Sequence, residues 1–181
     1  MGTDGCCCRF NWKQVGDIAL GRPHLGPMMH LAVYRLMQYT LREMICREYG
    51  HDKASDLLRT AGLRAGEEFC ANMLNCSQDF NGFIAELQEK LRELGVGILR
   101  IEKADLEQMN FTLTVGEDLD CSGLPVTGAA VCEYDEGFIA GVLGRYTGKA
   151  FAAKEVDCWA TGDRTCRFSV TLADQVGDNG N

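Results

Sequence analysis

The residues best placed to bind a metal ion lie near the C-terminus, where one carboxylate and three cysteines recur at short intervals. Glu155 precedes Cys158 by three residues, and Cys158 and Cys166 lie symmetrically about Gly162. If the chain turns at Gly162 as a β-hairpin, the two cysteines become near cross-strand neighbours, with Cβ atoms roughly 4.5–5.5 Å apart. Cys132 lies upstream, at the start of a region with helical periodicity, and that end of the helix could pack over both thiols. Three thiolates and one carboxylate suffice for a tetrahedral zinc ion.

The spacing alone leaves two other interpretations open. Cys158 and Cys166 could be buried free thiols that act as small hydrophobic side chains, or they could form a cross-strand disulfide in an oxidising compartment. The chain begins MGTDGCCCRF, without the basic start and apolar core of a secretory signal. We therefore expect a cytoplasmic location, where thiols stay free or bind metal. Cys6, Cys7 and Cys8 are adjacent and lack the spacing of a structural zinc site, so we assign them to a loose N-terminal extension.

Composition and charge indicate one folded domain and exclude several classes of partner. The chain has 181 residues, of which 46% are hydrophobic and 24% charged, as in ordinary globular domains. The formal net charge of −8 opposes non-specific binding to nucleic acid or to anionic membranes, since both require a basic surface. No apolar run approaches the ~18 residues of a membrane span. We expect neither nucleic acid nor membrane as a partner.

Common catalytic motifs are missing from the sequence. Residues 144–150, GRYTGKA, resemble a phosphate-binding loop, but only three residues separate the glycines and Ala150 follows the lysine. There is no dinucleotide-binding fingerprint, no nucleophile elbow, and no histidine pair with metal-ligand spacing. We therefore assign no catalytic residue, and the sequence favours binding over catalysis.

Hydrophobic periodicity predicts an α+β domain, with a helical N-terminal half packed on a mainly antiparallel sheet. The predicted helices span residues 28–49, 53–74, 79–94 and 126–147, and the predicted strands span 97–102, 110–115, 150–159 and 164–172. Asp52 is the expected N-cap of the second helix. Gly62 and Gly66 within that helix predict either a break or a close contact with another helix.

Two apolar surfaces in this pattern suggest functions. The first helix carries a long apolar stripe, which predicts either core packing or a homodimer interface; its members are Leu31, Tyr34, Met37, Leu41, Met44 and Ile45. The strand at 110–115 has one apolar face that the third helix can cover. A cavity between them would bind an apolar ligand, and we expect Phe83, Phe111 and Tyr134 to line it.

The run from Pro125 to Phe168 resembles the 4-vinyl reductase (4VR) domain family. In that family a cysteine precedes a glycine-rich helix like GFIAGVLGRYTG, and a Glu-x-x-Cys and a further cysteine after a Gly-Asp turn follow. The matching residues here are Cys132, Glu155, Cys158, Gly162, Asp163, Cys166 and the aromatic Phe168. The segment RPHLGPMMHLAVYRLMQYTLREMICREYG, with GLRAGEEF after it, is similar to the helical half of the family. We therefore divide the chain into an N-terminal extension (1–22), a 4VR-like domain (23–172) and a disordered tail (173–181).

The resemblance implies a fold, a metal site and a mode of assembly. Related folds occur in the sensor domains of phenol-responsive transcription activators and in subunits of the TRAPP tethering complex, which dimerise through helices. By analogy with the phenol sensors, four residues would hold a structural zinc ion, namely Cys132, Glu155, Cys158 and Cys166. The histidine and tryptophan with which those sensors hold the ligand hydroxyl do not map securely here, where Phe83 and Phe111 occupy the aligned neighbourhoods.

These observations favour a sensor or carrier domain that binds an aromatic, hydrocarbon or tetrapyrrole-like molecule, contains a structural zinc ion, forms a homodimer and signals to a partner protein. Two alternatives stay open. One is a 4-vinyl reductase acting on tetrapyrroles of the (bacterio)chlorophyll type, and the other is a dimeric protein-interaction module.

Overall fold

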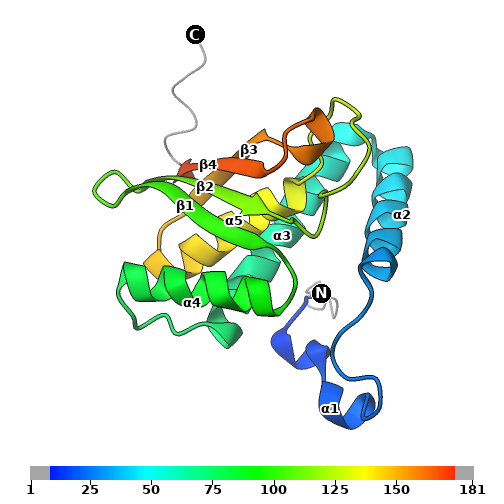
Figure 1. The fold of residues 1–181 in the computed structure, drawn as a ribbon, viewed down its shortest axis with the longest axis horizontal. Helices are drawn as coiled ribbons and strands as arrows, with labels where there is room; N and C mark the ends of the chain where they lie inside the picture. Colours follow the sequence, from blue (N-terminus) through cyan, green and yellow to red (C-terminus); the bar gives the residue numbers. More distant parts are fainter. Residues whose placement is uncertain (1–8, 174–181) are drawn as a thin grey trace, which may run out of the picture.

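The structure, a computed structural model, describes residues 9–173. A four-stranded antiparallel sheet, in the order β1-β2-β4-β3, packs against helices on one face (Figure 1). The elements in chain order are η1 (Trp12–Val15), α1 (Ile18–Gly21), α2 (Leu31–Tyr49), α3 (His51–Met73), α4 (Phe80–Glu93), β1 (Ile98–Asp105), β2 (Asn110–Gly116), α5 (Glu133–Thr147), β3 (Phe151–Asp157), the 3-10 turn η2 (Trp159–Thr161) and β4 (Cys166–Leu172). This α+β architecture confirms the predicted fold class.

The core lies between the sheet and the two helices α4 and α5. On β2, Phe111, Leu113 and Val115 are buried, as their alternation predicts. On the neighbouring strand β4, Phe168 pairs with Leu113 and Cys166 with Val115. The apolar face of the sheet thus runs without interruption from β2 into the strand that carries the last predicted metal ligand.

Helix boundaries depart from the sequence prediction at three N-termini. α2 begins at Leu31 rather than residue 28, with the His30 side chain accepting a hydrogen bond from the backbone of Ala32. α3 begins at His51, so Asp52 lies inside its first turn and is not its N-cap. α5 begins at Glu133 rather than 126, because Pro125 and the left-handed backbone of Gly128 (φ 78°) keep the preceding segment extended.

α3 and α5 cross in close contact behind the sheet, and glycines on both helices form the crossing. An added Cβ at Gly62 would lie 2.0 Å from the backbone oxygen of Tyr134, and one at Gly137 would lie 1.9 Å from the backbone oxygen of Arg59. Gly66 and Gly141 are in similar contacts. α3 therefore continues unbroken, and its two glycines serve the close helix contact rather than a break.

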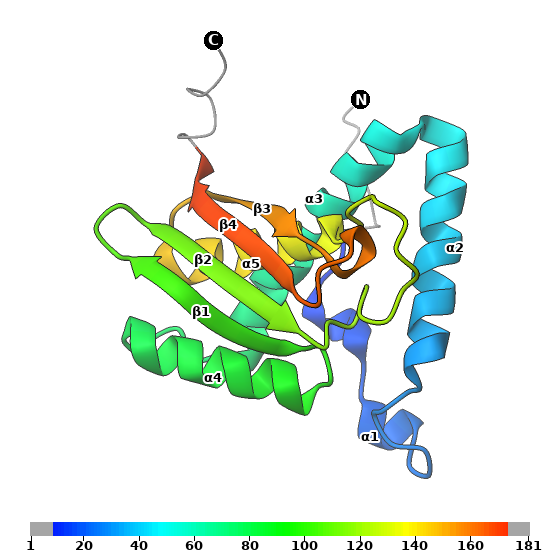
Figure 2. The ribbon, with the colours of Figure 1, turned by 45° about the horizontal axis from the view of Figure 1, so that its top comes forward.

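α2 stands apart from the sheet and turns its polar side chains inward (Figure 2). It buries no residue completely, and Leu36 and Met37 are 68% and 60% exposed. Polar residues on the other face of α2, among them Tyr34, Arg35 and Arg42, are the half-buried ones. The predicted apolar stripe consequently lies on the surface of the single chain rather than in its core.

Within residues 9–173, no helix combines the length and the apolarity that crossing a bilayer requires. Cys6, Cys7 and Cys8 and residues 174–181, which make up most of the predicted tail, lie outside the described residues.

Candidate metal centre and ligand pocket

Four buried cysteines from four separate segments meet at one end of the sheet. They are Cys121 in the loop after β2, Cys132 at the N-cap of α5, Cys158 after β3, and Cys166 at the start of β4. All four sulfur atoms lie within 4.8 Å of one another, with 3.0 Å between Cys121 and Cys166 and 3.9 Å between Cys132 and Cys158. Each cysteine is at most 1% exposed, and none of the four forms a disulfide. We call this set the thiol cluster.

The β3–β4 connection places two of these thiols as the symmetry about Gly162 predicts. Gly162 is left-handed with φ 111°, a conformation that favours glycine, and it ends the 3-10 turn η2. The Thr161 hydroxyl donates to the backbone oxygen of Cys158 at 2.7 Å and so fixes the turn beside that cysteine. Cys166 then enters β4 in register with Val115.

A polar network holds Cys121, which the sequence analysis did not single out. The Asp118 carboxylate accepts hydrogen bonds from the backbone N–H groups of Asp120 and Cys121 at 2.8 and 3.0 Å. The guanidinium of Arg35 on α2 donates to the backbone oxygens of Leu119 and Ser122. Cys121 lies within a turn-rich stretch with no metal-ligand spacing to the other cysteines, so only the folded chain shows that it joins them.

Glu155 lies buried near the thiol cluster but is not among its four converging side chains. Neither carboxylate oxygen of Glu155 has a hydrogen-bond partner among the described residues. Burial raises the pKa of Glu155 to about 8, and the negative charge of Cys158 raises it further. Such an unpartnered buried acid is costly unless it is neutral or meets a cation.

The donor set fits a thiophilic metal ion such as zinc. Zinc in structural sites takes four ligands, which are thiolates, imidazoles or carboxylates. The thiol cluster supplies four sulfur donors, and Glu155 supplies a carboxylate that has no other partner within residues 9–173. Interactions with the neighbouring thiols, Cys121 first, raise the pKa of Cys132 and lower that of Cys158, so Cys158 is the thiol most ready to lose its proton.

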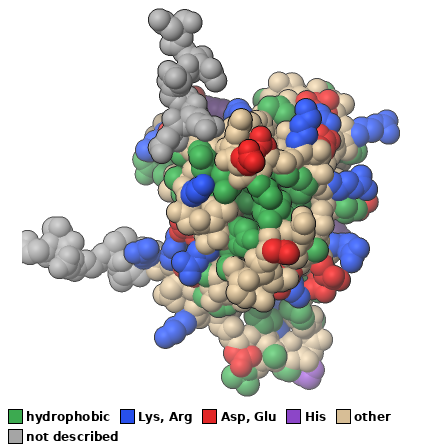
Figure 3. All heavy atoms as spheres, turned by 90° about the vertical axis from the view of Figure 1, so that its left-hand side faces the viewer, with side chains coloured by type: hydrophobic (Ala, Val, Ile, Leu, Met, Phe, Trp, Pro, Cys, Tyr) green, Lys and Arg blue, Asp and Glu red, His purple; other side chains and the backbone are tan. Residues whose placement is uncertain are grey.

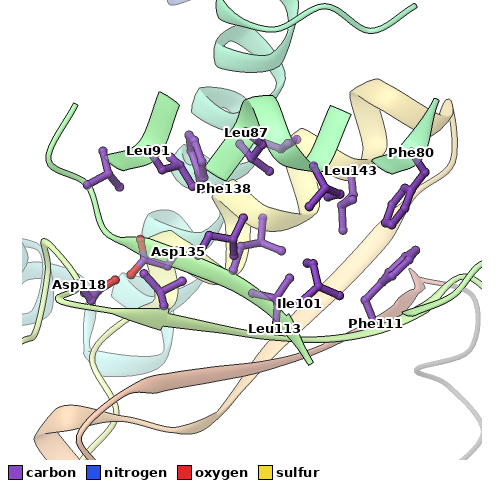
Figure 4. A pocket seen from close by; sticks show the side chains of 16 residues that line it. Phe80, Leu87, Leu91, Ile101, Phe111, Leu113, Asp118, Asp135, Phe138 and Leu143 are labelled. Carbon is purple, nitrogen blue, oxygen red and sulfur yellow. The ribbon is translucent and has the colours of Figure 1, made fainter. Parts of the chain in front are cut away.

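A narrow apolar cavity of about 40 Å³ adjoins the thiol cluster, between α4, the sheet and α5 (Figure 4). Its walls include Leu87 and Leu91 on α4, Leu113 on β2, and Phe138 on α5. Phe80 and Phe111 lie at one end, with their rings stacked at a centroid distance of 5.4 Å. Hydrophobic side chains also gather in the middle of the molecular face beside the β1–β2 turn (Figure 3).

Two carboxyl groups, from Asp118 and Asp135, occupy the opposite end of the cavity and point toward each other (Figure 4). One oxygen of each lies within 4.8 Å of the other and of the Cys132 sulfur. Burial, and then the charge of Asp120, raises the pKa of Asp118 to about 6. Burial and the charges of Asp118 and Asp120 raise the pKa of Asp135 well above its usual value.

The three aromatic residues expected to bind the ligand occupy different environments. Phe111 lines the cavity, as its position on β2 suggests. Phe83 is fully buried beside it and stacks on Tyr146 with ring centroids 3.9 Å apart, but it is not part of the cavity wall. Tyr134 is half-buried near the N-terminus of α5, also outside the wall. Their roles in binding stay predictions.

Comparison with known families places the thiol cluster within a described domain. Residues 111–172 match the family model of the vinyl-4-reductase (4VR) domain. This segment runs from β2 to β4 and contains all four cysteines of the thiol cluster, together with Glu155.

Two curated relatives come from Methanocaldococcus jannaschii. Protein MJ0150 is 25% identical over 111 residues, which are 61% of this chain and 63% of that protein. Protein MJ1642 is 30% identical over 109 residues, which are 60% of this chain and 62% of that protein. The chain thus spans less than two thirds of the length of either relative.

Three solved structures share the fold. The phenol-responsive sensory domain of the transcription activator PoxR, solved with phenol, superposes with a TM-score of 0.64 at 17% identity over 84% of this chain and 79% of that one. A vinyl-4-reductase family protein from M. jannaschii gives 0.58 at 15% identity, with 86% and 91% coverage. A trafficking protein particle complex subunit 3 from Naegleria fowleri, covalently bound to palmitic acid, gives 0.62 at 11% identity, with 78% and 94% coverage. The family match and the shared fold together confirm the resemblance of this chain to the 4-vinyl reductase domain family, with residues 111–172 as the segment that matches the family model.

Proposed function

We propose that this protein is a sensor or carrier domain that binds an apolar small molecule between α4, the sheet and α5, and that a zinc ion in the thiol cluster braces one end of the site. The observation that carries the proposal is the juxtaposition of an almost wholly apolar cavity with four buried, converging thiols. Both features share the loop at 118–121 and the first turn of α5. The similarity of the fold to a phenol-responsive sensory domain supports a binding role.

The zinc ion would be held by Cys132, Cys158 and Cys166, with Glu155 as the fourth ligand that the family resemblance implies. The converging thiol of Cys121 is a second candidate for that position. A zinc ion with four protein ligands has no open position for substrate, so its contribution would be structural. It would join the loop after β2, the start of α5 and the β3–β4 hairpin.

A cavity of about 40 Å³ must widen to admit an aromatic ring. An engineered cavity that binds benzene measures about 150 Å³. α4 forms one wall, and its C-terminal end is followed by Gly95, which adopts a left-handed conformation with φ 70°. We propose that α4 shifts outward when a ligand enters, and that this movement transmits the signal.

Ligand binding should raise the melting temperature. At a ligand concentration a hundredfold above Kd, the free energy of unfolding increases by about 2.7 kcal/mol. A thermal-shift screen of phenols, hydrocarbons, fatty acids and porphyrins, repeated on Phe111→Ala, is the test. We expect one class to stabilise the wild type, and Phe111→Ala to change that shift strongly. Phe69→Ala, which removes a ring outside the cavity wall, should retain it. Failure of every class to raise the melting temperature would favour the interaction-module alternative.

We further propose a homodimer formed by the outward apolar face of α2. Leu36, Met37 and Met44 are each more than half exposed there, while the polar face of the same helix contacts the chain itself. A helix with this orientation leaves an apolar surface that a second copy would cover. Signals to a partner protein would then pass through the paired helices.

Light scattering at micromolar concentration should give the mass of two chains. Met37→Glu should produce monomers, because it buries a charge in the proposed interface. Glu48→Lys, an exposed change near the end of the same helix, should leave the dimer intact. A monomeric wild type would remove this interpretation.

A further inference from the structure

We infer that the cavity selects a ligand whose apolar body carries a protonated amine, and that Asp135, assisted by Asp118, holds the amine. This inference rests on the proposed function, since it specifies the class of molecule that the same cavity binds. It concerns the polar end of the cavity, to which no predicted ligand residue belongs.

The geometry of Asp135 carries the first step. Asp135 lies in the first turn of α5, and its carboxyl group reaches the end of the cavity, facing Asp118 (Figure 4). Its Oδ2 atom is buried and has no hydrogen-bond partner among the described residues. Apart from these two carboxyl groups, the cavity wall is apolar. A bound molecule therefore meets polar groups at one end only, and a donor there would satisfy an oxygen that the chain leaves unpaired.

The balance of charge carries the second step. Four further groups that can carry negative charge lie near Asp135, namely Asp118, Asp120, Cys166 and Glu155. The nearest arginines are engaged elsewhere. Arg35 donates to backbone oxygens of the loop, and Arg42 forms a bidentate ion pair with Glu133. Within the described part of the chain, no lysine or arginine forms an ion pair with Asp118 or Asp135.

A cation on the ligand would complement this environment better than a neutral group. A protonated amine can donate to both carboxyl groups at once, and such charge-assisted hydrogen bonds are stronger than neutral ones. A hydroxyl group can donate to only one of them and leaves the charge uncompensated. A pure hydrocarbon would fill the apolar end and leave Asp135 without a partner. Affinity should therefore fall in the order amine, alcohol, hydrocarbon.

The test measures binding of three probes of similar shape, benzylamine, benzyl alcohol and toluene, to the full chain by calorimetry at one pH near neutrality. We expect benzylamine to bind the wild type roughly tenfold or more tightly than toluene, as charge-assisted hydrogen bonds imply. Asp135→Asn should abolish this preference while leaving toluene binding in place, and Asp118→Asn should reduce it. Glu117→Gln is the matched control, since it removes a neighbouring carboxylate that is exposed and outside the cavity wall, and it should retain the preference.

The outcomes separate this inference from the proposed function. If toluene binds as tightly as benzylamine, the amine inference is overturned and the apolar cavity stands. If Asp135→Asn is folded by circular dichroism and still prefers benzylamine, the amine is held elsewhere. If Asp135→Asn does not fold, the wild-type comparison and Asp118→Asn decide. If no apolar molecule of any class binds, the proposed function itself fails.

Discussion

Replacing Cys158 by serine is expected to abolish metal binding and to unfold much of the domain at room temperature. Structural zinc contributes on the order of 10 kcal/mol of apparent binding free energy in small metal domains. The stability of a whole domain is typically only ~5–15 kcal/mol. Cys158 is 1% exposed and joins the β3–β4 turn to the N-cap of α5, so its loss disconnects elements that pack only through this cluster at their ends.

The measurement is the metal content and melting temperature of freshly purified Cys158→Ser beside the wild type. Cys46→Ser is the matched control, because Cys46 is a half-buried free cysteine on α2 away from the thiol cluster. The pair Glu155→Gln and Cys121→Ser then identifies the fourth ligand, since the variant that removes it should lose more zinc. An unchanged melting temperature in Cys158→Ser would contradict a structural metal.

The second large effect is expected at the crossing of α3 and α5. Gly137→Ala would place a Cβ atom 1.9 Å from the backbone oxygen of Arg59 and 2.7 Å from the backbone nitrogen of Leu63. Both contacts are with backbone atoms of a long helix, so no side chain can rotate to relieve them. The helices must separate, and α5 carries Cys132 and Asp135 with it. We expect a loss of more than about 3 kcal/mol in the free energy of unfolding, at the upper end of overpacking costs.

Chemical denaturation of Gly137→Ala provides the test. Gly21→Ala is the control, because no atom lies within 4 Å of the added Cβ there and the backbone φ is not left-handed. The control should change the stability by well under 1 kcal/mol. If Gly137→Ala matches the wild type in its denaturation midpoint, the helix crossing cannot be as close as the structure shows.

Periodicity was sufficient to predict most elements because local patterns determine them. α4 is an example, since Asp79 caps its N-terminus and its apolar residues share one buried face. The symmetry of Cys158 and Cys166 about Gly162 also follows from chain geometry alone. The start of α5 was misplaced by seven residues, because apolar residues in the extended segment before it mimic a helical pattern.

Two features of the site could not be predicted from local patterns. Cys121 reaches the other thiols only because Asp118 and Arg35 fix the loop that carries it, and Arg35 lies more than 80 residues upstream. Asp135 reads as an ordinary acidic residue in the first turn of a helix, where carboxylates are common. Only the packing of α5 against the sheet shows that its carboxyl group reaches the end of a cavity. Likewise, periodicity cannot tell which side of α2 faces solvent.

The central claim is that a metal ion in the thiol cluster braces a binding domain, and native mass spectrometry of the freshly purified protein tests it most directly. The account predicts one zinc ion per chain, with all four cysteines of the cluster reduced. A protein free of metal, or one whose mass shows a disulfide between cysteines of the cluster, would contradict it.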